Sequence, residues 1–252
     1  MSRQRAAAAA AVRMLNVEGI TAPIEIRRHP RARRLTLRVC RSEGNVVLTM
    51  PRYSDMREAN RFLSSNVAWL RERLQGVPAS IPFEPGAIVP LRGVPHEVHF
   101  LDAASRSSVV QVHDEGGEQV ASRLVVMGRT EHAPRRLKDW LMAEALRDID
   151  ARVTHHAANL GLRARRITLR DQKSRWGSCS SSGQLSFSWR LILAPPVVLD
   201  YVAAHEVAHL AEMNHGPRFW KLVAETMPRL EEARRWLHTH GVDLHRYGAD
   251  RT

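Results

Sequence analysis

The residues whose types and spacing could do chemistry lie in the C-terminal third of the chain. His205 and His209 are four positions apart, Glu206 stands between them, and His215 follows six residues after His209. Positions i and i+4 share one face of a helix, so the first two imidazoles can bind one metal ion. Three neutral imidazoles leave the fourth position of a tetrahedral Zn2+ open for water, as in catalytic zinc sites. Glu206 is then the predicted general base.

The elements that must position these residues are a helix and the turn after it. A strand runs to Leu193, and Ala194-Pro195-Pro196 ends it and leads into a helix predicted from 197 to about 211. Met213-Asn214 can break that helix and return His215 to the first two histidines, because Asn tolerates the left-handed conformation. The competing interpretation is a pair of buried, hydrogen-bonded histidines on a core helix.

The preceding part of the chain predicts a small mixed sheet. Alternating apolar residues indicate strands near 24–26, 35–39, 46–50, 94–101, 108–112 and 124–127. Ser54 is the predicted N-cap of a helix that reaches Leu74, with Trp69 on its core face. We therefore expect an N-terminal extension over residues 1–20, frayed or disordered, and a β-rich region over residues 21–130.

The remaining elements form the region that holds the histidines, predicted to be a catalytic domain over residues 131–247. Apolar spacing predicts helices at 134–160, 218–227 and 231–240. Two strands are expected at 166–169 and 184–188, the second continuing to Leu193. Together these elements predict the α+β class: an N-terminal mixed sheet with one helix, then an α+β domain built around the HExxH helix.

Charge and cysteine content limit the choice of partner and compartment. The net charge is +12, which suits a polyanionic partner such as nucleic acid, although an arginine-rich composition on solvated surfaces explains it equally well. Cys40 and Cys179 are too few for a disulfide framework. No run approaches the roughly 18 apolar residues of a membrane span. We expect a cytoplasmic protein.

Three segments resemble the YgjP-like metallopeptidase family, which is related to the SprT-like and WLM-type zinc proteases. They are WGSC at 176–179, WRLILAPPVVLDYVAAHEVAHL from Trp189, and NHGPRFW at 214–220. The resemblance extends over nearly the whole chain. It implies a zincin-like catalytic domain, Zn2+ as cofactor, His205, His209 and His215 as its ligands, and Glu206 as the general base.

One position departs from a neighbouring pattern. Metzincins with this histidine spacing have glycine three residues after the second histidine, where this chain has Glu212. We therefore expect the helix to extend further and to turn at Met213-Asn214. No counterpart of the metzincin Met-turn is evident, so metzincins are not a detailed template.

Four further residues are candidates for contact with substrate or with the metal ligands. Tyr201 lies one turn before His205, and Arg218 lies three residues after His215; either can serve as a second electrophile, or else in helix packing or as a solvated charge. Trp176 can stack on substrate or pack in the core. Cys179 can reach the zinc as an inhibitory thiolate, or simply fill the turn.

These residues predict a zinc metallopeptidase of the HExxH type that hydrolyses peptide bonds in a protein or peptide substrate. The basic charge and the related protease families favour substrates associated with nucleic acid. The same site can instead hydrolyse a phosphoanhydride such as a nucleoside triphosphate. A basic nucleic-acid-binding protein with a structural zinc is the alternative from another class. The sequence leaves the oligomeric state open.

Overall fold

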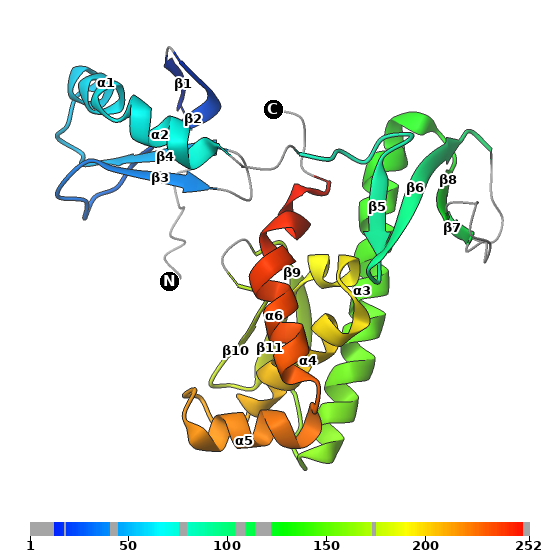
Figure 1. The fold of residues 1–252 in the computed structure, drawn as a ribbon. Helices are drawn as coiled ribbons and strands as arrows, with labels where there is room; N and C mark the ends of the chain where they lie inside the picture. Colours follow the sequence, from blue (N-terminus) through cyan, green and yellow to red (C-terminus); the bar gives the residue numbers. More distant parts are fainter. Residues whose placement is uncertain are drawn as a thin grey trace, which may run out of the picture. The chain divides into compact units, whose positions relative to one another are not determined.

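The computed structural model describes residues 13–17, 19–40, 45–75, 80–103, 109–113, 122–172 and 175–248. The chain divides into two compact units, one of residues 1–80 with 251–252 and one of residues 81–250 (Figure 1). This division differs from the boundary expected near residue 130. The fold class is α+β, as predicted from the sequence.

The N-terminal unit is a four-stranded sheet with two helices on one face. Its strands are β1 (Arg13–Val17), β2 (Ile20–Arg28), β3 (Thr36–Cys40) and β4 (Asn45–Met50), in the order β1-β2-β4-β3. β2 and β4 are parallel and the other pairs are antiparallel. Ile24, Ile26, Val46, Leu48 and Met50 alternate along the two central strands, and they form the core with Ala59, Leu63 and Leu70 of the helices. Strand β1 occupies part of the expected N-terminal extension, and residues 1–12 lie outside the described residues.

The expected helix over residues 54–74 is interrupted in the structure. α1 (Met56–Ser65) begins after Asp55, whose carboxylate accepts from the Glu58 amide at 2.7 Å, so Asp55 is the N-cap in place of Ser54. Asn66 then separates α1 from α2 (Val67–Leu74). Leu63 and Leu70 lie seven residues apart, about two turns, and both are buried, whereas Trp69 stands one position off that row and is 38% exposed. The prediction that Trp69 lies in the core is therefore wrong.

The second unit opens with another four-stranded sheet that packs on the longest helix. β5 (Ile88–Leu91), β6 (Val94–Leu101), β7 (Val110–His113) and β8 (Arg123–Met127) are ordered β5-β6-β8-β7. Val89, Val98 and Leu124 of this sheet share one core cluster with Leu137 and Leu141 of α3 (Ala133–Asn159). That shared core explains why the compact unit extends back to residue 81.

The remaining elements surround the histidine motif. β9 (Arg166–Arg170) and β11 (Gln184–Ser188) are parallel, and β10 (Gly177–Cys179) pairs antiparallel with β11 at the edge of this three-stranded sheet. α4 (Pro196–Ala208) packs against α3, β10, α5 (Pro217–Thr226) and α6 (Leu230–His240). A 3₁₀ segment, η3 (Gly241–Arg246), follows α6 (Figure 1).

The segment between β11 and α4 differs from the expected continuous strand. Residues Trp189–Leu193 form a 3₁₀ helix, η2, and all five are buried. The Ser188 hydroxyl accepts from the Arg190 amide at 3.4 Å and caps this helix. A short 3₁₀ helix that is buried on all sides has the same continuous run of apolar residues as a buried strand. Hydrophobic periodicity therefore does not distinguish the two. Within the described ranges, none of the helices combines the length and apolar character that crossing a bilayer requires.

Candidate metal centre

Three imidazoles converge at the C-terminal end of α4. His205 lies in its last turn, and His209 stands directly after its last residue, Ala208. The helix thus ends before the predicted residue 211, and residues 209–216 form the connection that returns His215 to the other two. One ligand nitrogen from each histidine lies within 4.8 Å of the other two. His205 Nε2 and His215 Nε2 are 3.1 Å apart.

The remaining nitrogens of two of these rings have partners that orient them. His209 Nδ1 lies 3.0 Å from the carbonyl oxygen of Glu212, so this nitrogen donates and Nε2 keeps its lone pair. The Tyr201 hydroxyl lies 3.4 Å from His205 Nδ1. An imidazole that bonds a polar group through one nitrogen is held in the orientation that presents the other to a metal.

An aromatic side chain from α5 packs against all three imidazoles. The ring centroid of Phe219 lies 4.8, 4.5 and 4.7 Å from those of His205, His209 and His215. Phe219 is fully buried, and Trp220 lies 6.0 Å from two of the histidines. α5 therefore restricts the rotamers of residues that come from α4 and from the loop after it.

Burial and mutual repulsion favour the neutral forms of His205 and His209. Burial, followed by the proximity of His209 and His215, lowers the pKa of His205 to about 4. Burial also lowers the pKa of His209, against the hydrogen bond to Glu212. Neutral imidazoles near pH 7 have free lone pairs, which is the state that a metal ion requires.

Glu206 is a buried carboxyl group beside this cluster. It is 5% exposed, and its Oε2 has no hydrogen-bond partner within the described part of the chain. Burial raises its pKa to about 8, although the charge of Arg175 opposes this shift. An unpaired buried carboxylate oxygen is costly in a folded protein, so it points to a functional role or to a group that this structure does not contain.

Gly177 leaves the space that the Glu206 side chain occupies. A Cβ at this position of β10 would lie 2.5 Å from Glu206 Oε1 and 2.7 Å from its Cδ. Real Cβ atoms do not approach other atoms so closely, and Gly177 has no positive φ that would otherwise require glycine. The residue is therefore glycine because the carboxylate of Glu206 packs directly on the strand backbone.

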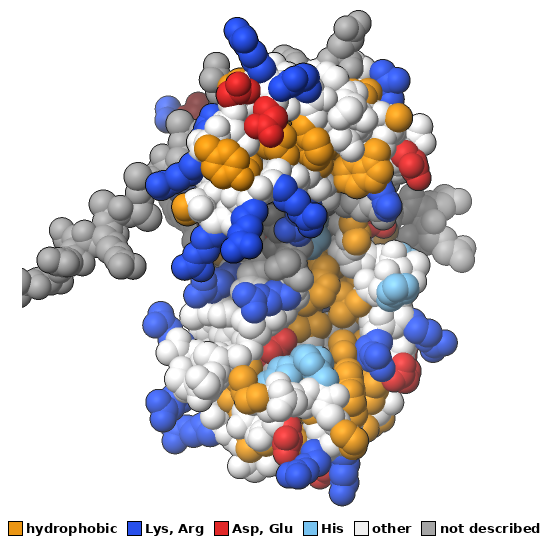
Figure 2. All heavy atoms as spheres, turned by 90° about the vertical axis from the view of Figure 1, so that its left-hand side faces the viewer, with side chains coloured by type: hydrophobic (Ala, Val, Ile, Leu, Met, Phe, Trp, Pro, Cys, Tyr) orange, Lys and Arg blue, Asp and Glu red, His pale blue; other side chains and the backbone are white. Residues whose placement is uncertain are grey.

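A cavity of about 460 Å³ lies over the histidine cluster. Figure 2 shows histidine side chains gathered at the surface, beside a carboxylate and a hollow with hydrophobic walls. The lining includes the three histidines, Glu206 and three of the additional candidates, Tyr201, Trp176 and Cys179. Arg218 does not line it: its side chain is 88% exposed and lies 3.6 Å from the Glu212 carboxylate.

Cys179 lines the cavity without joining the nitrogen cluster. Among the described residues, the potential metal-binding group consists of the three histidines alone. Burial, together with the charge of Glu206, raises the pKa of the Cys179 thiol. Its sulfur donates to the Ser180 carbonyl at 3.4 Å. A thiol in this setting is held in its protonated form, which is a poor metal ligand.

The wall formed by residues 175–179 is supported by the C-terminal segment. The ring of His245 in η3 stacks on Trp176 with a centroid distance of 5.0 Å. The backbone at Gly241 packs closely on the same indole, because a Cβ at this position would lie 3.3 Å from the Trp176 ring. η3 therefore fixes the indole that adjoins Gly177.

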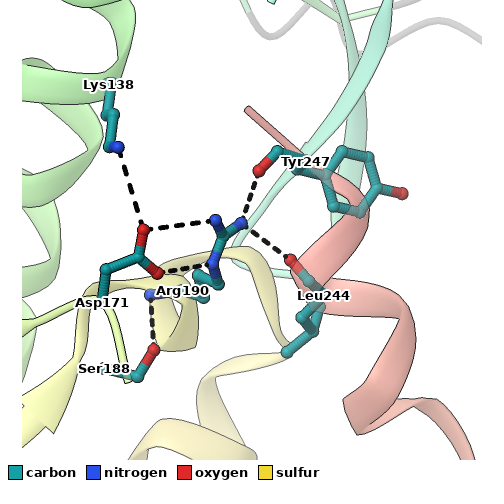
Figure 3. Close-up of polar contacts among 6 residues, drawn as sticks. All are labelled: Lys138, Asp171, Ser188, Arg190, Leu244 and Tyr247. Atoms are coloured by element: carbon teal, nitrogen blue, oxygen red, sulfur yellow. Dashed lines mark hydrogen bonds and ion pairs between the residues drawn. The ribbon is translucent and has the colours of Figure 1, made fainter. Parts of the chain in front are cut away.

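Arg190 holds this segment in place (Figure 3). Its guanidinium donates to the carbonyl oxygens of Leu244, at 3.2 Å, and of Tyr247. The same group pairs with the Asp171 carboxylate at 3.0 Å, and Lys138 lies 3.8 Å from that carboxylate. Arg190 is 4% exposed, and its charge is compensated by the Asp171 carboxylate at the surface and by the two carbonyl oxygens.

The sequence did not indicate several of these contacts. Arg190 and Gly241 contact residues that are distant along the chain, and a single sequence contains no signal for such pairs. Phe219 stands in the quoted NHGPRFW segment, but only the structure shows that it packs on all three imidazoles. Gly177 stands in the quoted WGSC segment, but only the structure shows that Glu206 is its neighbour. The Glu212 carbonyl is a backbone group and has no sequence signature.

Comparison with known proteins bears on the family of this chain. The family model described as "YgjP-like, metallopeptidase domain" matches residues 33–240. No curated protein shows significant similarity to the chain. The crystal structure of the metallopeptidase zymogen of Pyrococcus abyssi abylysin is similar at 21% identity, over 36% of this chain and 93% of that chain, with a TM-score of 0.34. That structural likeness is too limited to support an argument. The family match spans most of the chain, and this protein belongs to the YgjP-like metallopeptidase family.

Proposed function

We propose that the protein is a zinc-dependent peptidase that uses His205, His209 and His215 as metal ligands and Glu206 as general base. The observation that carries this proposal is the convergence of three imidazole nitrogens within 4.8 Å, beside a buried carboxylate oxygen with no partner among the described residues. Two nitrogens 3.1 Å apart match the edge of a tetrahedron with zinc–nitrogen bonds, which measures about 3.3 Å. The donor set therefore suits Zn2+.

The chain's own residues have separable tasks in this proposal. Bound zinc would polarise the scissile carbonyl and lower the pKa of a water molecule. A bound cation would favour the ionised form of Glu206, which then accepts the proton of the attacking water and delivers it to the leaving nitrogen. Tyr201, one turn before His205, is within reach of the same cavity and is the candidate second electrophile. Arg218 is too exposed for that role.

The edge of β10 offers a place for an extended peptide. The backbone amide of Ser188 donates to the Trp176 carbonyl at 2.8 Å, and the backbone amide of Ser180 donates to the Gln184 carbonyl at 2.9 Å. In an antiparallel pair the bonded positions alternate, so the amides and carbonyls of Gly177 and Cys179 point away from β11. This edge lines the cavity. A substrate strand that pairs there would lie beside Glu206.

The decisive experiment compares Glu206→Gln with the wild type on unstructured protein and peptide substrates. We expect the variant to lose cleavage by about 10²–10⁴-fold, the usual contribution of a general base, while retaining bound zinc and the same melting temperature. Hydrolysis of nucleoside triphosphates in place of peptides, lost in the same variant, would support the phosphoanhydride alternative. Zinc retained by a wild type that hydrolyses neither substrate would favour a structural site.

The proposed substrates are proteins associated with nucleic acid. The proposed location is the cytoplasm, because two cysteines are too few for a disulfide framework. The charge supports such substrates: residues 1–80 contain 15 arginines and 6 acidic residues, so they carry +9 of the net +12. Nucleic acid should then stimulate cleavage of a DNA-binding protein, with a stimulation that declines as salt rises. Cleavage that is indifferent to both would contradict this part of the proposal.

A further inference from the structure

The positive charge is concentrated in one part of the sequence. Residues 81–252 contain 23 basic and 20 acidic residues, a net of +3, against +9 for residues 1–80. An arginine-rich composition would affect both parts alike. Acidic residues balance arginine in the second part and not in the first, so composition alone does not account for the difference.

The excess is greatest around one end of the N-terminal sheet. Residues 26–54 contain eight arginines and a single acidic residue, Glu43. The loop after β2 and the turn after β4 meet there, because the Arg28 guanidinium donates to the carbonyls of Arg52 and Ser54, each at 2.9 Å. We call this surface the basic edge. It consists of Arg28, Arg31, Arg33, Arg34, Arg52 and Tyr53, all of which are exposed.

The arginines of the basic edge are not used in ion pairs. No carboxylate lies within ion-pair distance of Arg31, Arg33, Arg34 or Arg52 in the described ranges, and Arg28 contacts carbonyl groups only. The acidic residues that follow in sequence, Asp55 and Glu58, belong to the start of α1, where Asp55 serves as the cap. Several unpaired guanidinium groups on one short surface favour a partner with closely spaced negative charges.

An exposed aromatic ring stands within the same surface. Tyr53 is 78% exposed, and its hydroxyl donates to the Arg33 carbonyl at 2.9 Å. This bond links the turn after β4 to the loop after β2 while the ring remains open to solvent. An ordered, exposed aromatic ring among arginines is suited to stacking on an unpaired base, whereas the bases of a duplex already stack on one another.

We propose that the basic edge binds single-stranded nucleic acid, with the arginines on the phosphates and Tyr53 stacked on a base. The inference deepens the nucleic-acid part of the proposed function and rests on it, but it does not depend on the metal chemistry. The phosphodiester backbone attracts the guanidinium groups, and the tyrosine ring distinguishes an unstacked strand from other polyanions. DNA and RNA share this chemistry, so the test includes both.

The test measures anisotropy of fluorescent single-stranded DNA and RNA oligonucleotides of about 16 nucleotides with the full chain. Replacing Arg31, Arg33 and Arg34 by alanine should weaken binding about tenfold or more and reduce the slope of log affinity against log salt by about 2. The matched control replaces Arg135, Arg163 and Arg166, three exposed arginines of the second unit, and removes the same charge. It should change the affinity by no more than about twofold, because those residues would contact no phosphate.

Variants of Tyr53 distinguish the binding of a single strand from a general attraction to polyanions. Tyr53→Ala should weaken binding at least about fivefold, and Tyr53→Phe should retain most of the affinity, because the stacking surface remains. Equal losses in the two triple-arginine variants, or equal affinity for a duplex, would overturn the inference. The inference would also be overturned if the protein bound anionic vesicles or polyglutamate through the same arginines and Tyr53→Ala left that binding unchanged. Glu206→Gln protein should bind the oligonucleotides like the wild type, so loss of peptidase activity and loss of binding are measured separately.

Discussion

The arginines of the basic edge differ from two arginines of the second unit in the partners they have. In the second unit, Arg190 is buried against Asp171 and two carbonyls, and Arg92 pairs with Glu144 and Asp148 at 2.8 Å. In the N-terminal unit, the arginines of the basic edge are exposed and have no carboxylate partner among the described residues. Both units have an apolar core between a sheet and helices. The difference therefore concerns these arginines: Arg190 and Arg92 bind carboxylates of their own unit, whereas the basic edge remains accessible to a partner.

Loss of the metal should have the largest effect. It should abolish peptide hydrolysis by the second unit and leave nucleic-acid binding by the N-terminal unit unchanged. His209→Ala removes a proposed ligand, so we expect loss of bound zinc and a decrease in peptide hydrolysis on the order of a thousandfold or more. Metal content and cleavage rates measure this. Affinity for a single-stranded oligonucleotide should not change. A parallel loss of nucleic-acid binding would show that the two units do not act separately.

Gly177→Ala tests the contact between β10 and Glu206. The added Cβ must displace the carboxylate, and a misplacement of about 1 Å in a catalytic group typically costs about a hundredfold in rate. We expect kcat to fall while the zinc content and the KM stay close to the wild type. Gly216→Ala is the matched control, because a Cβ there meets no atom within 4 Å. Similar losses in the two variants would argue against a specific role for Gly177.

A buried and an exposed arginine can be compared directly. Arg190→Met keeps the packing on Trp189 but removes a compensated charge, so the free energy of unfolding should decrease by about 2–3 kcal/mol. Arg38→Met changes an exposed arginine of β3, and surface substitutions usually change the free energy of unfolding by less than about 0.5 kcal/mol. Chemical denaturation followed by tryptophan fluorescence measures both. Equal effects would contradict the contrast between the units.

The smallest predicted effect concerns an acid-sensitive ion pair. Burial alone would raise the pKa of Asp200, but hydrogen bonds from His156, at 2.7 Å, and from Arg152 outweigh it and lower that pKa. The ionised Asp200 therefore contributes its full stabilisation of the fold above about pH 3.9, the pKa of an aspartate in the unfolded chain. This contribution is lost as the pH falls through the lower pKa that Asp200 has in the folded protein.

Asp200→Asn measures this contribution. The variant should be less stable than the wild type by about 1 kcal/mol at neutral pH, and the difference should shrink below about pH 4. Asp139→Asn, at an exposed position of α3, should differ little from the wild type over the same pH range. If the difference in the free energy of unfolding between Asp200→Asn and the wild type did not change with pH, the hydrogen bonds of Asp200 and not its charge would stabilise the fold.

The sequence predicted the local parts of the site better than the distant ones. The α+β class and the YgjP-like family are confirmed. The spacing of His205, His209 and His215 follows from one helix and one turn, so residue types alone suggested that they meet. The packing of Phe219 on all three rings and the contacts of Arg190 depend on long-range folding. The exposure of Trp69 follows from the helical period: Leu63 and Leu70 share the buried face, and Trp69 lies one position off it.

The partner of His209 has a consequence for the tolerance of this site to substitution. The acceptor for Nδ1 is the backbone carbonyl of Glu212 and not a side chain. Substitutions at this position that leave the chain path unchanged should therefore preserve the tautomer of His209. A glutamate can consequently stand where metzincins have glycine, and we expect a library of variants at position 212 to retain metal far more often than a library at position 209.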